Sequence, residues 1–336
     1  MYKKVGIPRG LFYYKYFPLW KTFLEELGAE ITVSDATNKR ILDAGVKACV
    51  DEACLPVKLF HGHVLNLVGR VDCLFIPRFT SISKNEYVCP QFGGLPDTVR
   101  HTLKQLPPVI DTEVNLRKSS ANSWKAALET GSWFTSDKRL IKTAFEKAVR
   151  EYRNCRDKVR QGELPLPPAA SGRRTAAENI AGGSAGGEAL KIAVIGHVYN
   201  LYDTHINMNL LQKLVNNGVR VITTDMVPEE MINLSTHLLH KPMFWNFGRK
   251  ALGSAFHLAD TGKIDGIIYV MSFGCGIDSF VSDLMERRLK RQADLPFILL
   301  TLDEHSGEAG LDTRLEAFID MIRWRKDNEN NISASG

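Results

Sequence analysis

The chain has no long stretch of apolar residues. None of its 336 residues belongs to a run of the roughly 18 uncharged apolar residues that span a membrane, so we expect no membrane partner. The first residues, Met1 to Val5, run straight into an apolar segment and lack the core of a secretory signal. A cytoplasmic location follows as the expectation.

Dense runs of lysine and arginine are also missing. The formal net charge is only +5, and no nucleic-acid-binding motif occurs, so we expect no nucleic-acid partner. Hydrophobic residues make up 44% of the chain and charged residues 24%, values typical of a globular protein. The length suffices for two domains, each with its own core.

Cysteine is scarce, and its spacing is not that of a zinc site. None of the six cysteines forms the Cys-x2–4-Cys pair of structural zinc sites, since Cys49 and Cys54 lie five residues apart. Disulfides are rare in the reducing cytoplasm. Most of the six are therefore expected to be small core residues, unless the local sequence favours metal binding.

Short apolar segments alternate with helical patterns in both halves of the chain. The predicted strands lie at residues 3–8, 30–34, 71–77, 108–110, 191–195, 219–223, 266–271 and 296–302. This alternation predicts an α/β fold with two Rossmann-like wound domains, each built on a parallel sheet. In such a domain the loops that follow the strands share one edge of the sheet, where ligands bind.

Composition sets the expected boundaries of the parts. We expect an N-terminal α/β domain at residues 1–135, carrying Cys54 and Cys89, and a C-terminal α/β domain at residues 190–326, carrying Cys275. A charged connecting helix is expected at residues 136–168. Residues 169–189 are rich in Gly and Ala and lack aromatic side chains, which predicts a flexible linker. Residues 327–336 are expected to form a disordered tail.

Three cysteines stand in similar surroundings. Cys54 opens a predicted helix, Cys89 lies in a loop after the clearest strand of the first half, and Cys275 directly follows a strand. A helix start favours a thiolate, because its free backbone N–H groups and dipole attract negative charge. Gly274 and Gly276 let backbone amides approach a sulfur closely. We interpret the three thiols as one site, drawn from both domains.

The chemistry of three thiolates suits zinc or an iron–sulfur cluster. Three isolated cysteines fit a [4Fe–4S] cluster with one iron open to a non-protein ligand, whereas the usual cluster has four cysteine ligands. Spacing alone leaves open the alternative of three ordinary core or loop cysteines.

Other polar residues are candidates for binding a cofactor or lining the pocket. They are Lys58, His61, His63, Gly274, Gly276, His197, Asn200, Asp203 and His305. His61 and His63 are two residues apart and cannot share a helix face, so at most one is expected to face the thiols. Structural hydrogen bonding is the alternative for both. Carboxylates and imidazoles after strands of the second domain can perform acid–base chemistry or simply orient their loops; the sequence identifies no catalytic residue.

Longer motifs carry a family resemblance. The motifs are residues 50–58 (VDEACLPVK), 60–63 (FHGH), 196–203 (GHVYNLYD), 302–305 (LDEH) and 313–318 (TRLEAF). Together they resemble the iron–sulfur superfamily of 2-hydroxyacyl-CoA dehydratases, benzoyl-CoA reductases and double-cubane-cluster proteins. Within it, the sequence is most similar to the branch associated with acyl-CoA dehydratase activase. The resemblance covers both halves and omits only the linker and the tail.

The resemblance implies a cofactor and partners. The cofactor would be a [4Fe–4S] cluster with Cys54, Cys89 and Cys275 as ligands. The other cysteines do not match the motif, so a double cubane is not expected. The implied partners are an ATP-hydrolysing [4Fe–4S] activator protein and either a second dehydratase-like subunit or a second copy of this chain. A CoA thioester would be the substrate.

Three functions remain open from the sequence. The first is the cluster-bearing component of an ATP-dependent low-potential reductase or 2-hydroxyacyl-CoA dehydratase-like system, which receives electrons from the activator. The second is a non-catalytic cluster carrier or assembly partner of a larger dehydratase-type complex. The third, a binding module without metal, is disfavoured because all three motif cysteines are present.

Overall fold

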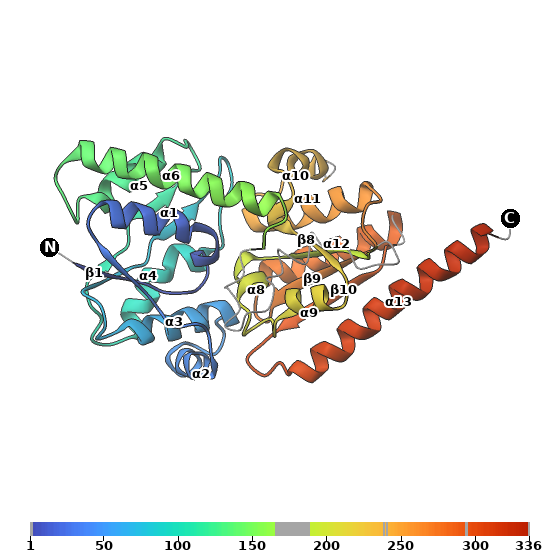
Figure 1. Cartoon of the computed structure of the whole chain (residues 1–336). Coiled ribbons are helices and arrows are strands. Elements are labelled where there is room, and N and C mark those ends of the chain that lie inside the picture. The colour runs from blue at the N-terminus through green and yellow to red at the C-terminus, as the bar shows by residue number, and fades with distance from the viewer. Residues whose placement is uncertain (1–2, 165–188, 238, 240, 293–294, 335–336) are drawn as a thin grey trace. The chain divides into compact units, whose positions relative to one another are not determined.

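The computed structural model describes residues 3–164, 189–237, 239, 241–292 and 295–334 (Figure 1). The chain divides into two compact units. Unit 1 comprises residues 1–161 and 239–249, and unit 2 comprises residues 162–238 and 250–336. The predicted flexible linker at residues 169–189 lies, except for its last residue, outside the described part of the chain.

Unit 1 is built on a four-stranded parallel sheet in the order β2-β1-β3-β5. Its strands are β1 (Lys4–Ile7), β2 (Glu30–Val33), β3 (Cys73–Phe75) and β5 (Val109–Ile110). A second parallel ladder, β4 (Arg78–Ser81) with β6 (Glu113–Asn115), follows β3 and β5 along the chain. Every residue of β3 is buried, as expected for a parallel sheet covered on both faces.

Six helices of unit 1 surround these strands. They are α1 (Tyr13–Glu26), α2 (Lys39–Ala48), α3 (Leu55–Leu67), α4 (Pro90–Thr102), α5 (Asn122–Gly131) and α6 (Lys138–Arg160). The helix expected to connect the domains, α6, packs against α1 through aromatic rings, with the Tyr16 and Tyr152 centroids 5.4 Å apart. The first turn of α11 (Asn246–Asp260) also belongs to unit 1. There Arg249 forms a buried ion pair with Glu86.

Helices α2 and α3 approach each other more closely than side chains allow. A Cβ atom on Gly62 would lie 2.0 Å from the carbonyl oxygen of Ile41, and one on Gly45 would lie 2.0 Å from that of Lys58. Glycine at both positions therefore permits the contact. This packing fixes the position of α3, the helix that Cys54 precedes.

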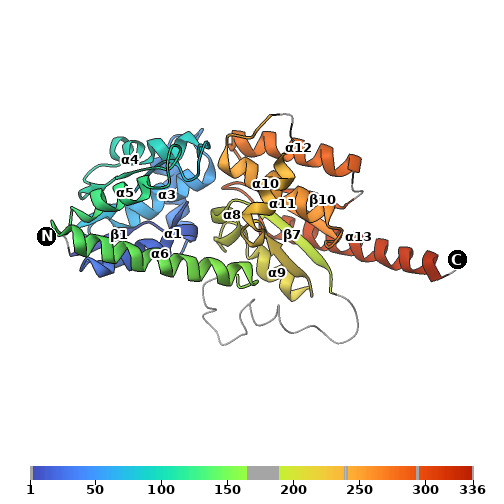
Figure 2. The same cartoon turned by 90° about the horizontal axis from the view of Figure 1, so that it is seen from above.

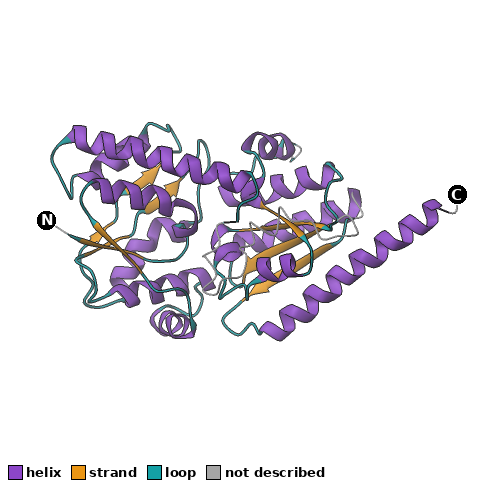
Figure 3. Cartoon of the chain, viewed as in Figure 1, coloured by secondary structure: helices purple, strands orange, loops and turns teal. Residues whose placement is uncertain are grey.

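Unit 2 is built on a parallel sheet of four strands in the order β10-β9-β7-β8. Figure 3 shows its strands as orange arrows among purple helices. Its strands are β7 (Lys191–Gly196), β8 (Arg220–Thr223), β9 (Gly266–Ser272) and β10 (Phe297–Leu302). All seven residues of β9 are buried, which marks the centre of the core. The continuous apolar sequence of β9 is typical of a strand with helices on both faces.

The helices of unit 2 cover both faces of its sheet (Figure 2). They are α8 (Val198–Tyr202), α9 (Leu210–Asn216), the 3-10 turn Thr224–Met226, α10 (Glu229–Thr236), α11, α12 (Gly276–Gln292) and α13 (Glu308–Ala334). On one face Lys213 of α9 forms an ion pair with Asp312 of α13 at 2.5 Å. On the other face the Arg288 guanidinium of α12 lies 4.1 Å from the ring centroid of Phe256 of α11.

Both sheets confirm the predicted α/β class with wound parallel sheets. In each unit the first strand pairs with the second on one side and with the third on the other. The connections therefore change direction beside the first strand, at β1/β3 in unit 1 and at β7/β9 in unit 2. Such a switch point opens a crevice at the carboxyl ends of the strands, which is the usual place for a ligand in this fold.

The last helix is longer than the sequence predicts. It was expected to end near Arg325, but α13 continues to Ala334, so the segment predicted as a disordered tail is helical up to that residue. None of the helices in the described residues is long and apolar enough to cross a membrane.

Candidate metal centre

All three predicted cysteines lie at the start of a helix. Cys54 is the N-cap residue of α3, Cys89 is the N-cap residue of α4, and Cys275 directly precedes Gly276, the first residue of α12. In the structure as described, the side chains of Cys54 and Cys89 do not cap their helices by hydrogen bonds. Three helix N-termini therefore present backbone N–H groups and positive dipole ends beside thiols, an arrangement that favours a bound anion or a thiolate.

The topology explains why these helix starts are suitable for ligands. A helix that joins two parallel strands runs back across the sheet, so its N-terminus lies at the carboxyl ends of the strands. This applies to α3, α4 and α12 alike. Unit 2 matches the usual ligand position of this fold best, because His197 follows β7 and Cys275 follows β9, the two strands at the switch point.

The other three cysteines have different surroundings. Cys73 is fully buried in β3, and burial raises the pKa of its thiol to about 11. Cys49 ends α2, and burial raises its pKa too. Cys155 lies along α6, where its thiol donates a hydrogen bond to Glu151 at 3.4 Å. None of these three precedes a helix in the described structure.

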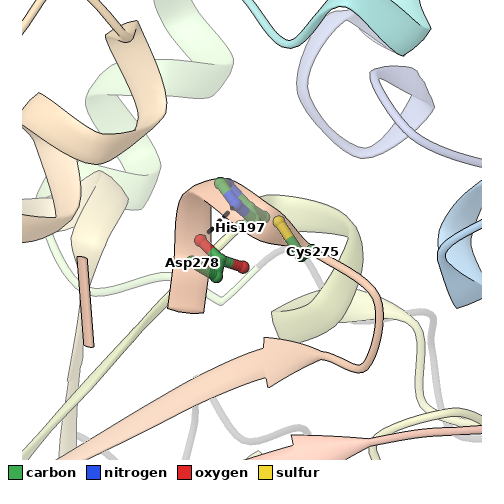
Figure 4. A group of neighbouring side chains, drawn as sticks. All are labelled: His197, Cys275 and Asp278. Carbon is green, nitrogen blue, oxygen red and sulfur yellow. Dashed lines mark ion pairs between the residues drawn. The ribbon is translucent and has the colours of Figure 1, made fainter. Parts of the chain in front are cut away.

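Unit 2 brings Cys275 together with His197 and with Asp278, one turn into α12 (Figure 4). One ligand atom from each residue lies within 4.8 Å of the other two. His197 Nε2 is 2.8 Å from Asp278 Oδ1, and the ring also forms a hydrogen bond with Cys275. Imidazole, thiolate and carboxylate can together hold a single metal ion such as zinc, and they are equally suited to surround one ligand of a larger centre.

The charges in this group act on one another in both directions. Burial opposes a charge on His197, but Asp278 and Cys275 together outweigh it and raise the histidine pKa to about 10. Burial raises the pKa of the Cys275 thiol, the hydrogen bond with His197 lowers it, and the Asp278 carboxylate raises it again, so the net shift is upward. Of the two neighbours, His197 is thus the one placed to stabilise a thiolate at Cys275.

The buried Tyr269 forms a hydrogen bond with Asp278. Burial holds the pKa of Tyr269 well above its ordinary value, so its hydroxyl keeps its hydrogen. That hydroxyl donates to Asp278 Oδ1 at 2.8 Å. The second carboxylate oxygen of Asp278, Oδ2, is buried and has no hydrogen-bond partner among the described residues. Such an oxygen is either a hydration site or a place for a further ligand.

Asn200 links the segment after β7 to the end of β9. Its Oδ1 accepts a hydrogen bond from Ser272 Oγ, the last residue of β9, at 2.8 Å. Its Nδ2 is buried and has no partner in the described part of the chain. Asn200 therefore fixes the distance between the β7 and β9 loops, which is a structural role close to the site.

The remaining candidates of unit 2 shape the loops around the site. Asp203 accepts hydrogen bonds from the backbone N–H groups of His205 and Ile206, so it orients the turn after α8. His305 is exposed, and its backbone N–H donates to Asp303. Gly274 has a φ of +80°, a conformation that suits glycine and turns the chain toward Cys275. A Cβ atom on Gly276 would meet no described atom within 4 Å, so space remains beside the thiol.

The candidates on α3 serve mainly to hold that helix. His63 Nδ1 lies 2.9 Å from Ser34 Oγ, and its Nε2 lies 3.1 Å from Thr37 Oγ1. His61 Nδ1 donates to the Val57 carbonyl at 2.8 Å, whereas Nε2 is buried without a partner in the described chain. Lys58 is buried, and its charge acts on the thiol of Cys49. These contacts agree with the structural alternative for both histidines.

The donor set fits the implied iron–sulfur cluster. Iron–sulfur clusters take thiolate ligands, and their sulfurs accept hydrogen bonds from nearby donors. The three thiols stand at helix starts that supply N–H groups, and the one in unit 2 has a cationic partner besides. Within unit 1, Cys54 and Cys89 are thus suited to bind such a cluster, and within unit 2 Cys275 is.

Asp278 and Tyr269 are the site residues that the sequence analysis missed. A signal for Asp278 was present, because a residue three positions after Cys275 in a helix start returns to the same side after one turn. No sequence pattern pointed to Tyr269, since it lies inside a continuous apolar strand.

Parallel wound sheets with cysteines at helix starts define a wound α/β protein with thiols at the edges of its sheets where ligands bind in this fold. Comparison with family models gives the particular family. The model of the CoA enzyme activase uncharacterised domain matches residues 4–227, and that of the 2-hydroxyglutaryl-CoA dehydratase D-component matches residues 146–322. The chain belongs to the family that these two models describe, which confirms the resemblance seen in its motifs. No curated protein matches it. The two matches together describe a dehydratase-like component of an activator-dependent system.

Proposed function

We propose that the chain is an iron–sulfur redox protein with Cys54, Cys89 and Cys275 as the protein ligands of one [4Fe–4S] cluster. Such a cluster accepts and releases single electrons at low potential. The observation that carries the proposal is the shared placement of the three thiols at helix starts on the carboxyl edges of their sheets. The proposal draws ligands from both units and leaves one iron for a non-protein ligand.

The chain would serve as the cluster-bearing component of an ATP-dependent low-potential reductase or 2-hydroxyacyl-CoA dehydratase-like system. Its electron would come from an ATP-hydrolysing [4Fe–4S] activator protein, and its substrate would be a CoA thioester. A second dehydratase-like subunit or a second copy of the chain would complete the assembly. The family matches support this class of system. We place the protein in the cytoplasm, where thiols stay reduced.

A second candidate function is a non-catalytic cluster carrier or assembly partner of a larger dehydratase-type complex. The name of the matching family, which describes one component of a dehydratase, favours it. Both candidates need the same cluster and differ in whether a substrate is converted.

The proposed ligands are tested by anaerobic purification and analysis of iron and sulfide. Wild type should contain about four irons per chain, and serine at Cys54, Cys89 or Cys275 should remove most of them. Cys49→Ser and Cys155→Ser are the matched controls and should keep the iron. Iron that persists in the three ligand variants, or protein that stays iron-free after anaerobic reconstitution, contradicts the proposal. About eight irons per chain would show a double cubane instead.

A turnover assay then distinguishes the two candidate functions, enzyme and carrier. The loaded protein is mixed with the activator, ATP and a reductant, and a 2-hydroxyacyl-CoA is added. An enzyme converts many equivalents of the thioester per chain. A carrier converts none, and instead passes its iron to a cluster-free dehydratase.

A further inference from the structure

His197 forms an ion pair with the buried Asp278 and a hydrogen bond with Cys275. We propose that His197 donates a hydrogen bond to the metal-bound sulfur of Cys275, and that Asp278 and Tyr269 hold the ring in place for it. By this contact the protein raises the reduction potential of its cluster. The inference rests on the proposed function, because it requires a cluster with Cys275 as a ligand.

The ring has little freedom to turn. His197 Nε2 is 2.8 Å from Asp278 Oδ1, and the Tyr269 hydroxyl donates to the same oxygen at 2.8 Å. His197 is 6% exposed, Asp278 1% and Tyr269 0%. The rings of His197 and Tyr199 stack with centroids 5.0 Å apart. These contacts are buried, so Asp278 acts as a positioning residue for the imidazole.

The direction of the hydrogen bond follows from its two partners. A thiolate that binds iron has lost its hydrogen, so it can only accept. An ionised carboxylate also only accepts. His197 Nε2 lies 2.8 Å from Asp278 Oδ1, and the ring also forms a hydrogen bond with Cys275, so among these three side chains the imidazole is the one that can supply a hydrogen. The chain of donors runs from Tyr269 and from His197 to Asp278, and from His197 to the sulfur.

A donor at a cluster ligand changes the electron affinity of the cluster. Reduction adds one negative charge, and part of that charge resides on the ligand sulfurs. A hydrogen bond to a sulfur stabilises the reduced form more than the oxidised form and so raises the potential. Hydrogen bonds to charged groups shift equilibria by about tenfold or more. A tenfold change in the reduction constant is 59 mV for one electron.

The test compares His197→Phe and Tyr269→Phe with wild type in redox titrations followed by EPR. Phenylalanine keeps a ring at position 197 but has no hydrogen to donate, so the reduction constant should fall about tenfold, that is, the potential should fall by 59 mV. Tyr269→Phe removes only the hydroxyl that holds Asp278, and should shift the potential in the same direction by less. His205→Phe, at an exposed histidine of the same unit, is the control and should leave the potential unchanged. Pulsed EPR should detect one exchangeable hydrogen fewer near the reduced cluster in His197→Phe than in wild type, because the backbone N–H of Asp278 remains beside the sulfur in both.

The outcomes separate the two levels of the argument. Iron-free wild type overturns the proposed function and the inference with it. Cluster-bearing His197→Phe with an unchanged potential overturns the inference alone. If His197→Phe does not keep its iron, Tyr269→Phe decides: a lowered potential supports the inference, and an unchanged potential overturns it.

Discussion

His63 offers a quantitative test of how α3, the helix behind Cys54, is held in unit 1. Its ring joins α3 to the segment after β2 through Ser34 and Thr37. Burial, reinforced by the nearby Arg9 guanidinium, lowers the pKa of His63 from 6.5 to about 3. The folded protein therefore keeps this imidazole neutral over a range in which the unfolded chain protonates it.

The proton balance sets the sign of the effect. Between pH 6.5 and about 3 the unfolded chain binds a proton at His63 that the folded chain does not bind. The stability that this residue contributes is complete above pH 6.5 and is lost as the pH falls through that window. The loss is about 1.4 kcal/mol for each pH unit below about 6.5. A change from about pH 7.5 to about pH 4.5 crosses about two such units and costs roughly 2.6 kcal/mol of unfolding free energy.

The assay is urea unfolding of wild type and His63→Gln at both pH values, followed by tryptophan fluorescence, to which Trp20, buried in unit 1, contributes. Glutamine is neutral at both values and still forms hydrogen bonds, so the variant should lose roughly 2.6 kcal/mol less than wild type on acidification. His101→Gln, an exposed histidine of α4, is the control and should follow wild type. Equal losses in wild type and His63→Gln, or an NMR titration of the His63 ring near 6.5, would refute the reasoning.

Two further predictions concern packing and buried charge. Gly62→Ala should lower the unfolding free energy by about 1–3 kcal/mol because its Cβ would meet a carbonyl oxygen of α2, whereas Gly276→Ala, with open space around it, should stay within about 0.5 kcal/mol of wild type. Equal urea midpoints for the two alanine variants would contradict the α2–α3 contact. Arg249→Met should cost about 3–5 kcal/mol because it leaves the Glu86 carboxylate buried without its cation, while Arg287→Met, an exposed ion pair on α12, should cost at most about 1 kcal/mol. A stable Arg249→Met variant would show that Glu86 is adequately bound by Ser83 and Asn246 alone.

The sequence was sufficient for the elements that are decided locally. The strands at β7 and β9 were recognisable because both are short apolar runs between turn residues. Cys54 was expected to open a helix, and it is the N-cap residue of α3, where Pro56 suits the first turn. The helix itself was expected at residues 59–68 and begins four residues earlier. The wound α/β class then followed from the alternation of strands and helices.

Elements that depend on tertiary contacts were harder to predict. Cys89 was expected in a loop, but α4 begins at Pro90 and continues through Pro96, so Cys89 is the N-cap residue of a helix. The short helix α8 lies in a segment expected to be a loop, and all of its residues are buried. At both places local rules favour a break in the helix, and burial in the unit overrides them.

The site was predictable to the extent that single residues carry its chemistry. A cysteine between two glycines after a strand drew attention to Cys275. The partnership of His197 with Asp278 was not predictable, because it joins the loop after β7 to the first turn of α12. Only the parallel pairing of β7 with β9 brings those two loops together.

The most direct test of the central claim is the iron content of Cys275→Ser after anaerobic reconstitution, measured beside wild type and Cys155→Ser. We predict about four irons per chain in wild type and in Cys155→Ser, and close to none in Cys275→Ser, with the far-UV spectrum unchanged. The same amount of iron in all three proteins would contradict the assignment of Cys275 as a cluster ligand, and an iron-free wild type would contradict the cluster itself.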